Sequence, residues 1–360
     1  MAQYRASFCL GICLKPDDGY ATSYFSLPWS CSVCIRFVRQ LMKNTLITGA
    51  SGFVGHALIK HLQKDGYVNT VALRKQVDNL PSSTRIAWVP SISAETDWAL
   101  ALLGQDVVIH CAARVHVMKE NSSDPLAAFR AVNVQGTLNL ARQAADSGVR
   151  RLVFISSIGV NGAETFQRPF SAEDEGAPHS PYAVSKYEAE LELQALAAKT
   201  GMEVVIIRPP LVYGFDAPGN FASLMRWLRR GVPLPLGAIH NQRSLVALDN
   251  LVDLIGTCIT HPAAANQVFL VSDGEDVSTP ELLRHMGQAI GHPARLIPIP
   301  TRLLKLVAAM IGKQDMAQRL CCSLQVDITK TRQLLGWTPP VSLALGLKKA
   351  AEGYLRETAV

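Results

Sequence analysis

The chain has 360 residues, of which 48% are hydrophobic and 18% are charged, and its formal net charge is +6 at pH 7. This length and composition predict a folded globular protein with one large domain or two modest ones. The positive charge is spread along the chain without a block of Lys and Arg, which argues against a nucleic-acid partner and agrees with a small anionic ligand. No apolar run reaches the ~18 residues of a membrane-spanning helix, so the sequence predicts no membrane insertion.

The first 41 residues carry few folding signals, and Met42 stands just before the first predicted strand. We expect residues 1–41 to be a disordered or non-native extension. Cys31 and Cys34 have the spacing of a zinc-binding pair, but the stretch lacks a second pair with that spacing, so we expect no metal site. The later cysteines lie in apolar surroundings, as reduced thiols of a cytoplasmic protein do.

From Asn44 onward, short apolar runs alternate with longer segments of helical periodicity. The predicted strands are 45–48, 68–73, 107–111, 151–155 and 203–207, and the predicted helices are 54–64, 125–147 and 182–199. This alternation indicates an α/β fold with a parallel sheet covered by helices on both faces. The strands are nearly continuous in Val, Ile and Leu, as strands buried on both faces are. After Tyr213, Gly and Pro loosen the pattern, which indicates a smaller lobe.

Three glycines, Gly49, Gly52 and Gly55, follow the first predicted strand and begin a helix. In this context glycines permit a tight turn and a close approach of the backbone to a pyrophosphate, which the positive end of the helix stabilises. The alternative is an ordinary tight turn. The second strand ends in Arg74 and Lys75 instead of the acid that binds the ribose 2′-hydroxyl of NAD. The sequence therefore favours NADP(H) as the cofactor, with NAD(H) as the alternative.

The stretch YAVSK places Tyr182 and Lys186 four residues apart, on one face of a helix that Ser180 and Pro181 are expected to begin. A nearby ammonium and the helix N-terminus both favour a phenolate, so this pair predicts a proton donor or acceptor. Such pairs also occur by chance on exposed helices. Ser157 follows a buried strand, where parallel sheets bind ligands, and we expect it to hydrogen-bond the same substrate oxygen as Tyr182. The alternative for Ser157 is a hydroxyl that satisfies a turn.

Many motifs occur in an order that is similar to one superfamily. They are TGASGFVG, HCAA, NVQGT, ISS, YAVSK, RPPLVYG, RSLVALDNL and LLGWTPPVSLALGL. Together, from Met42 to about Leu347, they resemble the extended short-chain dehydrogenases/reductases and, within them, the NAD-dependent epimerase/dehydratase family. The resemblance implies a doubly wound Rossmann sheet with bound NAD(P). It divides the chain into an NAD(P)-binding domain at 42–215, to which 244–262 returns, and a mainly substrate-binding lobe at 216–360.

The resemblance also implies the roles of individual residues. The catalytic set is Ser157, Tyr182 and Lys186. The cofactor set is Gly49, Ser51, Gly52, Phe53, Val54, Gly55, Arg74, Ala112, Asn133, Tyr182, Lys186 and Pro209. The substrate set is Ser157, Asn161, Asn220 and Arg243. Arg243 is expected at a nucleotide diphosphate, with a surface cation beside a strand as the alternative. Asp249 is expected to cap the following helix.

Dehydratases of the family have Thr-Asp-Glu where this chain has Ser157-Ile158-Gly159, so the acid and base of an elimination are missing. The resemblance then implies hydride transfer at C4 of a UDP-linked hexose. Because Arg74 favours NADPH, we expect a 4-ketoreductase of a UDP-4-keto-6-deoxy-N-acetylhexosamine in surface-polysaccharide synthesis. The alternative is a redox-neutral UDP-hexose 4-epimerase that retains NAD. Further alternatives are an NADPH-dependent reductase of a non-sugar ketone and a non-catalytic NADP-binding regulator. A homodimer is compatible with the sequence.

Overall fold

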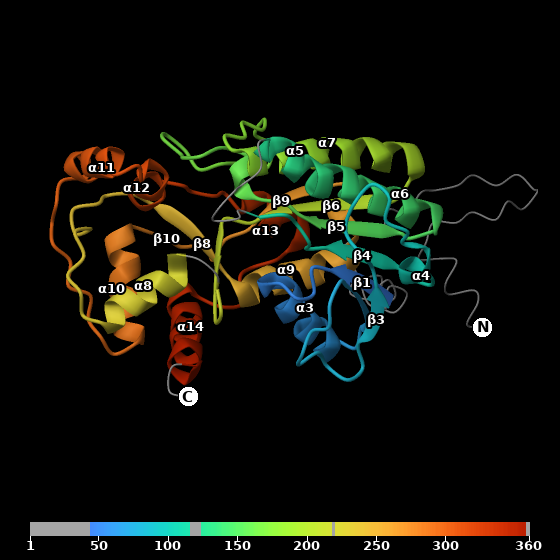
Figure 1. The fold of residues 1–360 in the computed structure, drawn as a ribbon, viewed down its shortest axis with the longest axis horizontal. Helices are drawn as coiled ribbons and strands as arrows, with labels where there is room; N and C mark the ends of the chain where they lie inside the picture. Colours follow the sequence, from blue (N-terminus) through green and yellow to red (C-terminus); the bar gives the residue numbers. More distant parts are fainter. Residues whose placement is uncertain (1–43, 116–123, 218–219, 358–360) are drawn as a thin grey trace, which may run out of the picture.

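The computed structural model of the chain describes residues 44–115, 124–217 and 220–357 (Figure 1). The predicted extension at 1–41, with Cys31 and Cys34, lies outside these residues. Within them, no helix has the length and apolar character needed to cross a membrane.

The larger sheet has seven strands in the order β3-β2-β1-β4-β5-β6-β9, and every pair in it is parallel. The strands are β1 (Asn44–Thr48), β2 (Val68–Leu73), β3 (Arg85–Trp88), β4 (Val107–His110), β5 (Arg151–Ile155), β6 (Glu203–Arg208) and β9 (Val268–Leu270). The chain reverses its direction of winding between β1 and β4, which is the point where such sheets bind ligands. The predicted α/β Rossmann fold is confirmed.

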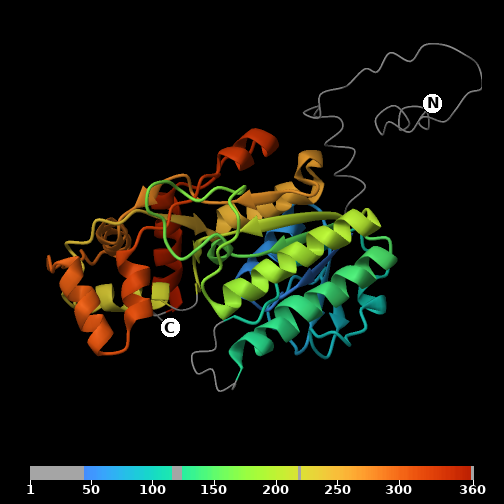
Figure 2. The ribbon, with the colours of Figure 1, turned by 90° about the horizontal axis from the view of Figure 1, so that it is seen from above.

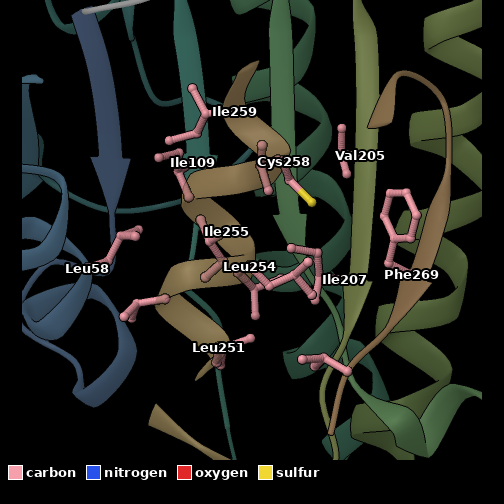
Figure 3. Close-up of a cluster of buried hydrophobic side chains, with 14 of the residues drawn as sticks. Leu58, Ile109, Val205, Ile207, Leu251, Leu254, Ile255, Cys258, Ile259 and Phe269 are labelled. Carbon is pink, nitrogen blue, oxygen red and sulfur yellow. The ribbon is translucent and has the colours of Figure 1, made fainter. Parts of the chain in front are cut away.

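Two helices cover one face of this sheet: α3 (Phe53–Lys64) and α9 (Leu248–Thr260). Figure 3 shows α9 lying along the strands, where side chains such as Leu254 and Ile255 meet Ile109 and Ile207. These side chains are fully buried, which is where the hydrophobic effect contributes most per residue.

The other face is covered by α6 (Thr137–Asp146) and α7 (Pro181–Thr200), which lie side by side (Figure 2). The shorter α4 (Ala99–Leu102) and α5 (Pro125–Arg130) complete this layer. The structure differs in one respect from the prediction of a single helix at 125–147. Between α5 and α6 the chain forms a π-helix, η1 (Ala131–Gly136). π-Helical turns are rare in proteins, and those that occur are frequently found at functional sites.

The second lobe has a sheet of three strands in the order β10-β8-β7, made of β7 (Leu211–Tyr213), β8 (Arg243–Ala247) and β10 (Asp276–Val277). Its helices are α8 (Asn220–Arg229), α10 (Thr279–Ala289), α11 (Thr301–Met310), α12 (Gln314–Cys321) and α14 (Leu343–Glu357). The lobe has its own hydrophobic core, in which residues such as Phe221, Leu283 and Leu347 are buried.

Short segments complete the fold: η2 (Ile158–Val160), η3 (Pro262–Ala264) and α13 (Thr329–Leu335). The chain passes repeatedly between the lobes. After β8 in the small sheet, α9 lies under the large one, β9 joins the large sheet and β10 returns to the small one.

Candidate active site

The glycine turn joins β1 to α3. Gly49 has φ +74°, and a Cβ built on it would lie 2.7 Å from the backbone N of Ala112. A Cβ on Gly55 would meet the backbone carbonyl of Gly49. Glycine is therefore required at both positions, by backbone conformation at Gly49 and by close packing at both. The turn also places Ala112, which was predicted on the nicotinamide side, directly against Gly49.

The N-terminus of α3 begins at Gly52, whose N–H donates to the Gly49 carbonyl at 2.9 Å. Among the described residues, no side chain caps this end, and the first turn carries no acid. The N–H groups of the next residues, Phe53 and Val54, have no partner within the helix by geometry. Such an end attracts an anion, as the sequence predicted for a pyrophosphate.

A cavity of about 580 Å³ lies beside the glycine turn. Ser51, Gly52 and Phe53 line it from the turn, and Val77–Asn79 line it from the loop after β2. Phe215 and other residues of the second lobe form the opposite wall. Arg74 stands exposed directly after β2, as predicted for a residue that meets a ribose phosphate.

Ser157 lies after β5 and begins the short helix η2. Its hydroxyl oxygen accepts a hydrogen bond from Gly159 N at 3.1 Å. This is the turn role that the alternative interpretation predicted, but it uses only an acceptor position, so the hydroxyl hydrogen remains able to donate. The Ser157 turn packs on the first turn of α7, because a Cβ on Gly159 would be 3.4 Å from Ala183 Cβ.

Tyr182 is the second residue of α7. As predicted, Ser180 caps this helix, accepting from Ala183 N at 3.2 Å, and Pro181 occupies the first turn. The half-buried ring of Tyr182 lies edge-on to Phe129, with ring centroids 6.0 Å apart. Burial raises the pKa of Tyr182 to about 12. The sequence predicted a lowered pKa for this phenol; in the protein alone desolvation raises it instead.

Lys186 is buried one turn further along α7. Its Nζ donates to the Ile155 carbonyl at 2.8 Å and lies 4.3 Å from the centre of the Phe154 ring. Burial lowers the pKa of Lys186 to about 8, against the opposing charge of Glu190. The ammonium is therefore fixed at the carboxyl end of β5, two residues before Ser157.

A row of hydrogen-bonded polar side chains crosses the carboxyl ends of β1 and β4. Thr48 Oγ1 lies 2.7 Å from His110 Nδ1, and His110 Nε2 lies 2.9 Å from Thr137 Oγ1. The imidazole stacks on Phe154, the same ring that faces Lys186. Burial, with the charge of Lys186, lowers the pKa of His110 to about 3, so the ring is neutral. The motif HCAA marked this segment in the sequence, but it did not predict that His110 stacks on Phe154.

Asn133 lies in the π-helix and is buried. Its amide binds both backbone groups of Arg114, accepting from N at 2.8 Å and donating to O at 3.0 Å, and also donates to Ser185 Oγ at 3.0 Å. The structure thus gives this predicted cofactor residue a positioning role, because it joins the chain after β4 to the helix that carries Tyr182 and Lys186.

Asn161 is also engaged within the protein. Its amide accepts from Arg208 Nη1 at 3.0 Å and donates to the Ser171 carbonyl at 2.9 Å. Arg208 in turn pairs with Glu190 on α7, and Glu190 also accepts a hydrogen bond from Ser156. This buried network was not predicted, because its members are far apart in sequence. Pro209 follows Arg208 in the sequence, and its carbonyl accepts a hydrogen bond from Ile158 N at 2.9 Å.

The predicted substrate residues of the second lobe are less closely gathered. Arg243 begins β8 and is half-buried, and its Nη1 donates to the Cys322 carbonyl at 3.1 Å. Burial lowers the pKa of this guanidinium. Asn220 is the first residue of α8, and its side chain lies outside the described part.

The prediction that Asp249 caps α9 is wrong. The N-cap is Ala247, without a side-chain cap, and Asp249 lies in the first turn, where it pairs with Lys349 at 2.6 Å. Asp273 instead accepts from Ala247 N at 2.7 Å. This acid follows β9, so local spacing could not reveal it.

The residues present fit a dinucleotide. The turn leaves no room for a Cβ at Gly49 or Gly55, and the uncapped N-terminus of α3 begins at it. No group of three or more potential ligands for a metal ion occurs in the described part of the chain.

Comparison with known proteins identifies the family of the chain. The model of the NAD dependent epimerase/dehydratase family matches residues 45–272. The chain belongs to this family. It is accordingly an enzyme of the epimerase/dehydratase type.

Two relatives illustrate the range of similarity. A UDP-glucose 4-epimerase of Vibrio cholerae is 50% identical over 321 residues, which cover 88% of this chain and 97% of the relative. An N-acetyl-alpha-D-glucosaminyl-diphospho-ditrans,octacis-undecaprenol 4-epimerase of Escherichia coli O157:H7 is 29% identical over 327 residues. They cover 86% of this chain and 94% of the relative. The crystal structure of UDP-glucose 4-epimerase from Thermotoga maritima with UDP-glucose superimposes with a TM-score of 0.69 at 25% identity. It covers 88% of this chain and 100% of the solved one.

Proposed function

We propose that this protein is a UDP-hexose 4-epimerase that interconverts the two configurations at C4 through a transient 4-ketosugar. The observation that carries the proposal is the 50% identity to the V. cholerae UDP-glucose 4-epimerase over nearly the whole of both chains. This supports the epimerase alternative over the 4-ketoreductase that Arg74 had favoured, because the cation indicates which coenzyme binds and says little about the reaction.

In this proposal the glycine turn and the α3 N-terminus hold the pyrophosphate of a nicotinamide dinucleotide. Lys186 binds the nicotinamide ribose, and Ala112 and Pro209 line the nicotinamide. When bound, this group supplies a hydride acceptor that returns the hydride to the opposite face of the sugar. The preference for NADP(H) over NAD(H) remains a prediction that rests on Arg74.

The chain itself moves the proton. Tyr182 removes the C4 hydroxyl proton as hydride leaves and restores it when hydride returns. Its pKa of about 12 in the protein alone makes the phenol a poor base, so the positive charge of the nicotinamide would have to lower that pKa when the site is filled. Ser157 donates its hydroxyl hydrogen to the same C4 oxygen and so orients it.

The substrate is a hexose linked through a diphosphate, and Arg243 is the proposed contact to that diphosphate. The E. coli relative is named for a sugar carried on a diphospho-undecaprenol, so a diphosphate ester is common to both relatives' names. We propose UDP as the carrier, because the more similar relative is named for UDP-glucose.

The test is incubation with UDP-glucose and with UDP-N-acetylglucosamine, followed by NMR of the sugar anomeric protons. An epimerase produces the C4 epimer without net consumption of reduced coenzyme. If the protein instead consumes NADPH in proportion to an added UDP-4-ketosugar and leaves UDP-hexoses unchanged, the ketoreductase is right and the epimerase proposal fails.

A further inference from the structure

The outer surface of α11 is apolar and exposed. Four of its residues recur at the spacing i, i+3, i+4, i+7, which places them along one stripe of a helix. They are Leu303, Leu306, Val307 and Met310, and Ile311 follows directly; their exposed fractions are 47%, 58%, 42%, 71% and 60%. We call these five residues the α11 face. Exposed apolar side chains that occur singly need no explanation, but a contiguous stripe marks an interaction surface.

Helix α11 is anchored to the second lobe, and this leaves the α11 face exposed. The opposite side of α11 packs on the second lobe through Leu304 and buried Ala308. At the helix start, Thr301 Oγ1 donates to the Ala238 carbonyl at 3.2 Å. The preceding segment is tied to the lobe through Ile297 N, which donates to the Leu234 carbonyl at 2.8 Å. The exposure therefore belongs to the folded state.

The sequence around this face has more cations than acids. Between residues 297 and 322 the sequence holds four cations, Arg302, Lys305, Lys313 and Arg319, and one acid, Asp315. Among the described residues, none of the four cations forms an ion pair. Arg302 precedes Leu303 and Lys313 follows Ile311, so cations stand at both ends of the apolar stripe.

We infer that the α11 face docks on an anionic membrane surface. An apolar stripe with flanking cations is the pattern of helices that lie in the plane of a bilayer interface, with apolar side chains below the headgroups and cations among the phosphates. A second copy of the chain fits less well, because a symmetric pairing of this face would bring the same cations together. The contact is peripheral, since no described helix can cross a membrane.

The position of the face gives docking a consequence for the site. Figure 1 shows α11 and α12 at the end of the second lobe, away from the large sheet. The segment after α12 returns to the start of β8, where the Cys322 carbonyl accepts from Arg243, and Lys305 of α11 donates to Cys322 Sγ at 3.5 Å. A bilayer bound at α11 would therefore be coupled through a short segment to the proposed diphosphate contact.

The test is flotation of the full-length protein with vesicles. Vesicles of phosphatidylglycerol and phosphatidylcholine should carry the protein, and vesicles of phosphatidylcholine alone should carry much less. The double variant Leu306→Glu/Met310→Glu should lower the partition into anionic vesicles by about tenfold or more, because carboxylates replace two exposed apolar groups in the middle and at the end of the stripe. Its turnover of UDP-glucose should remain unchanged, because neither residue lies in the site.

The matched control is Leu100→Glu/Leu103→Glu on α4, which alters two side chains exposed at 90% and 78% far from α11. This variant should bind vesicles like the unaltered protein. The inference is overturned if the α11 double variant still floats with anionic vesicles. It is also overturned if the unaltered protein binds no anionic vesicles. A change in the mass of the α11 variant in light scattering would then assign the face to a second copy of the chain.

Discussion

At the scale of single residues, the site combines the half-buried phenol of Tyr182 with the buried ammonium of Lys186. Burial acts on them in opposite senses. It raises the pKa of Tyr182 to about 12 and lowers the pKa of Lys186 to about 8, so in each case the uncharged form is favoured. Proton transfer by Tyr182 at neutral pH therefore depends on positive charge that the cofactor would add beside it.

Tyr182→Phe removes the hydroxyl and keeps the ring against Phe129. We expect kcat for epimerisation to fall by ~10²- to 10⁴-fold, the usual effect of a lost general acid or base, with little change in coenzyme affinity. Steady-state kinetics and coenzyme titration measure the two effects. The matched control is Tyr187→Phe, five residues further along the same helix, which should retain normal turnover. Near-normal turnover of Tyr182→Phe would refute the proposed proton transfer.

Lys186→Met tests the buried ammonium through the stability of the protein. The pKa of Lys186 is lower in the folded state than in the unfolded chain, so the unfolded chain binds more protons between about pH 8 and 10.5. The unaltered protein should gain free energy of unfolding relative to the variant as pH rises through this window, by on the order of 1 to 3 kcal/mol. Urea unfolding of both proteins at pH 7.5 and at pH 9.5 measures the difference. A difference that stays constant with pH would show that the ammonium is not desolvated.

Arg74→Asp tests the coenzyme preference. If the guanidinium binds a 2′-phosphate, its loss and the new repulsion should shift preference from NADP toward NAD by ~1 to 3 kcal/mol. Dissociation constants for both coenzymes measure this shift. Arg85→Asp, an exposed cation at the start of β3, is the control and should leave the ratio unchanged. If Arg74→Asp also leaves it unchanged, the prediction of NADP(H) from the end of β2 is wrong.

At the scale of elements, the glycine turn sets how closely the backbone of α3 approaches β1 and its ligand. Gly55→Ala would drive a Cβ into the Gly49 carbonyl, so the turn must open. We expect a loss of ~1 to 3 kcal/mol in stability and weaker coenzyme binding. Urea unfolding and coenzyme titration measure these losses.

Gly256→Ala is the matched control, because it lies inside α9 and its Cβ would make only an ordinary contact at 3.4 Å with His61. Alanine favours a helix over glycine, so this variant should be as stable as the unaltered protein or more so. A Gly55→Ala protein as stable as this control would contradict the close packing of the turn.

The same scale shows what sequence can and cannot predict. Strands β1, β2, β4, β5 and β6 were found because each is a short, almost continuous apolar run, and α7 was found because Ser180 and Pro181 give a local start signal. The other strands were not predicted; β3, for example, is only four residues long and mostly exposed. The π-helix around Asn133 was not found, because it differs from an α-helix in hydrogen-bond register and leaves the apolar spacing nearly unchanged. Asp273 was missed because its partner Ala247 is 26 positions away. Contacts between distant segments, such as Arg208 with Glu190, arise only when the sheet is assembled.

For the candidate site, the sequence predicted which segments meet, and the structure assigns the partners within them. Asn133 and Asn161 were predicted to contact ligands, yet both amides bind protein groups. Roles of the remaining site residues stay predictions until the variants above are measured.

At the scale of the whole molecule, the two lobes are joined by several passages of the chain and not by one linker. β6 leads to β7, α9 and β9 return to the large sheet, and β10 leaves it again. The two lobes also pack closely at Gly214, after β7, because a Cβ there would lie 3.3 Å from Phe53 on α3. Both cores are thus completed by residues from distant parts of the sequence.

These repeated passages restrict how the molecule can evolve and move. Neither lobe is a contiguous piece of sequence, so a recombination event that exchanged one lobe for another would have to cut and rejoin the chain at several places at once. New substrate specificities are then reached most easily by changing side chains or loops in place. For the same reason any movement of one lobe against the other has to bend or slide every passage together.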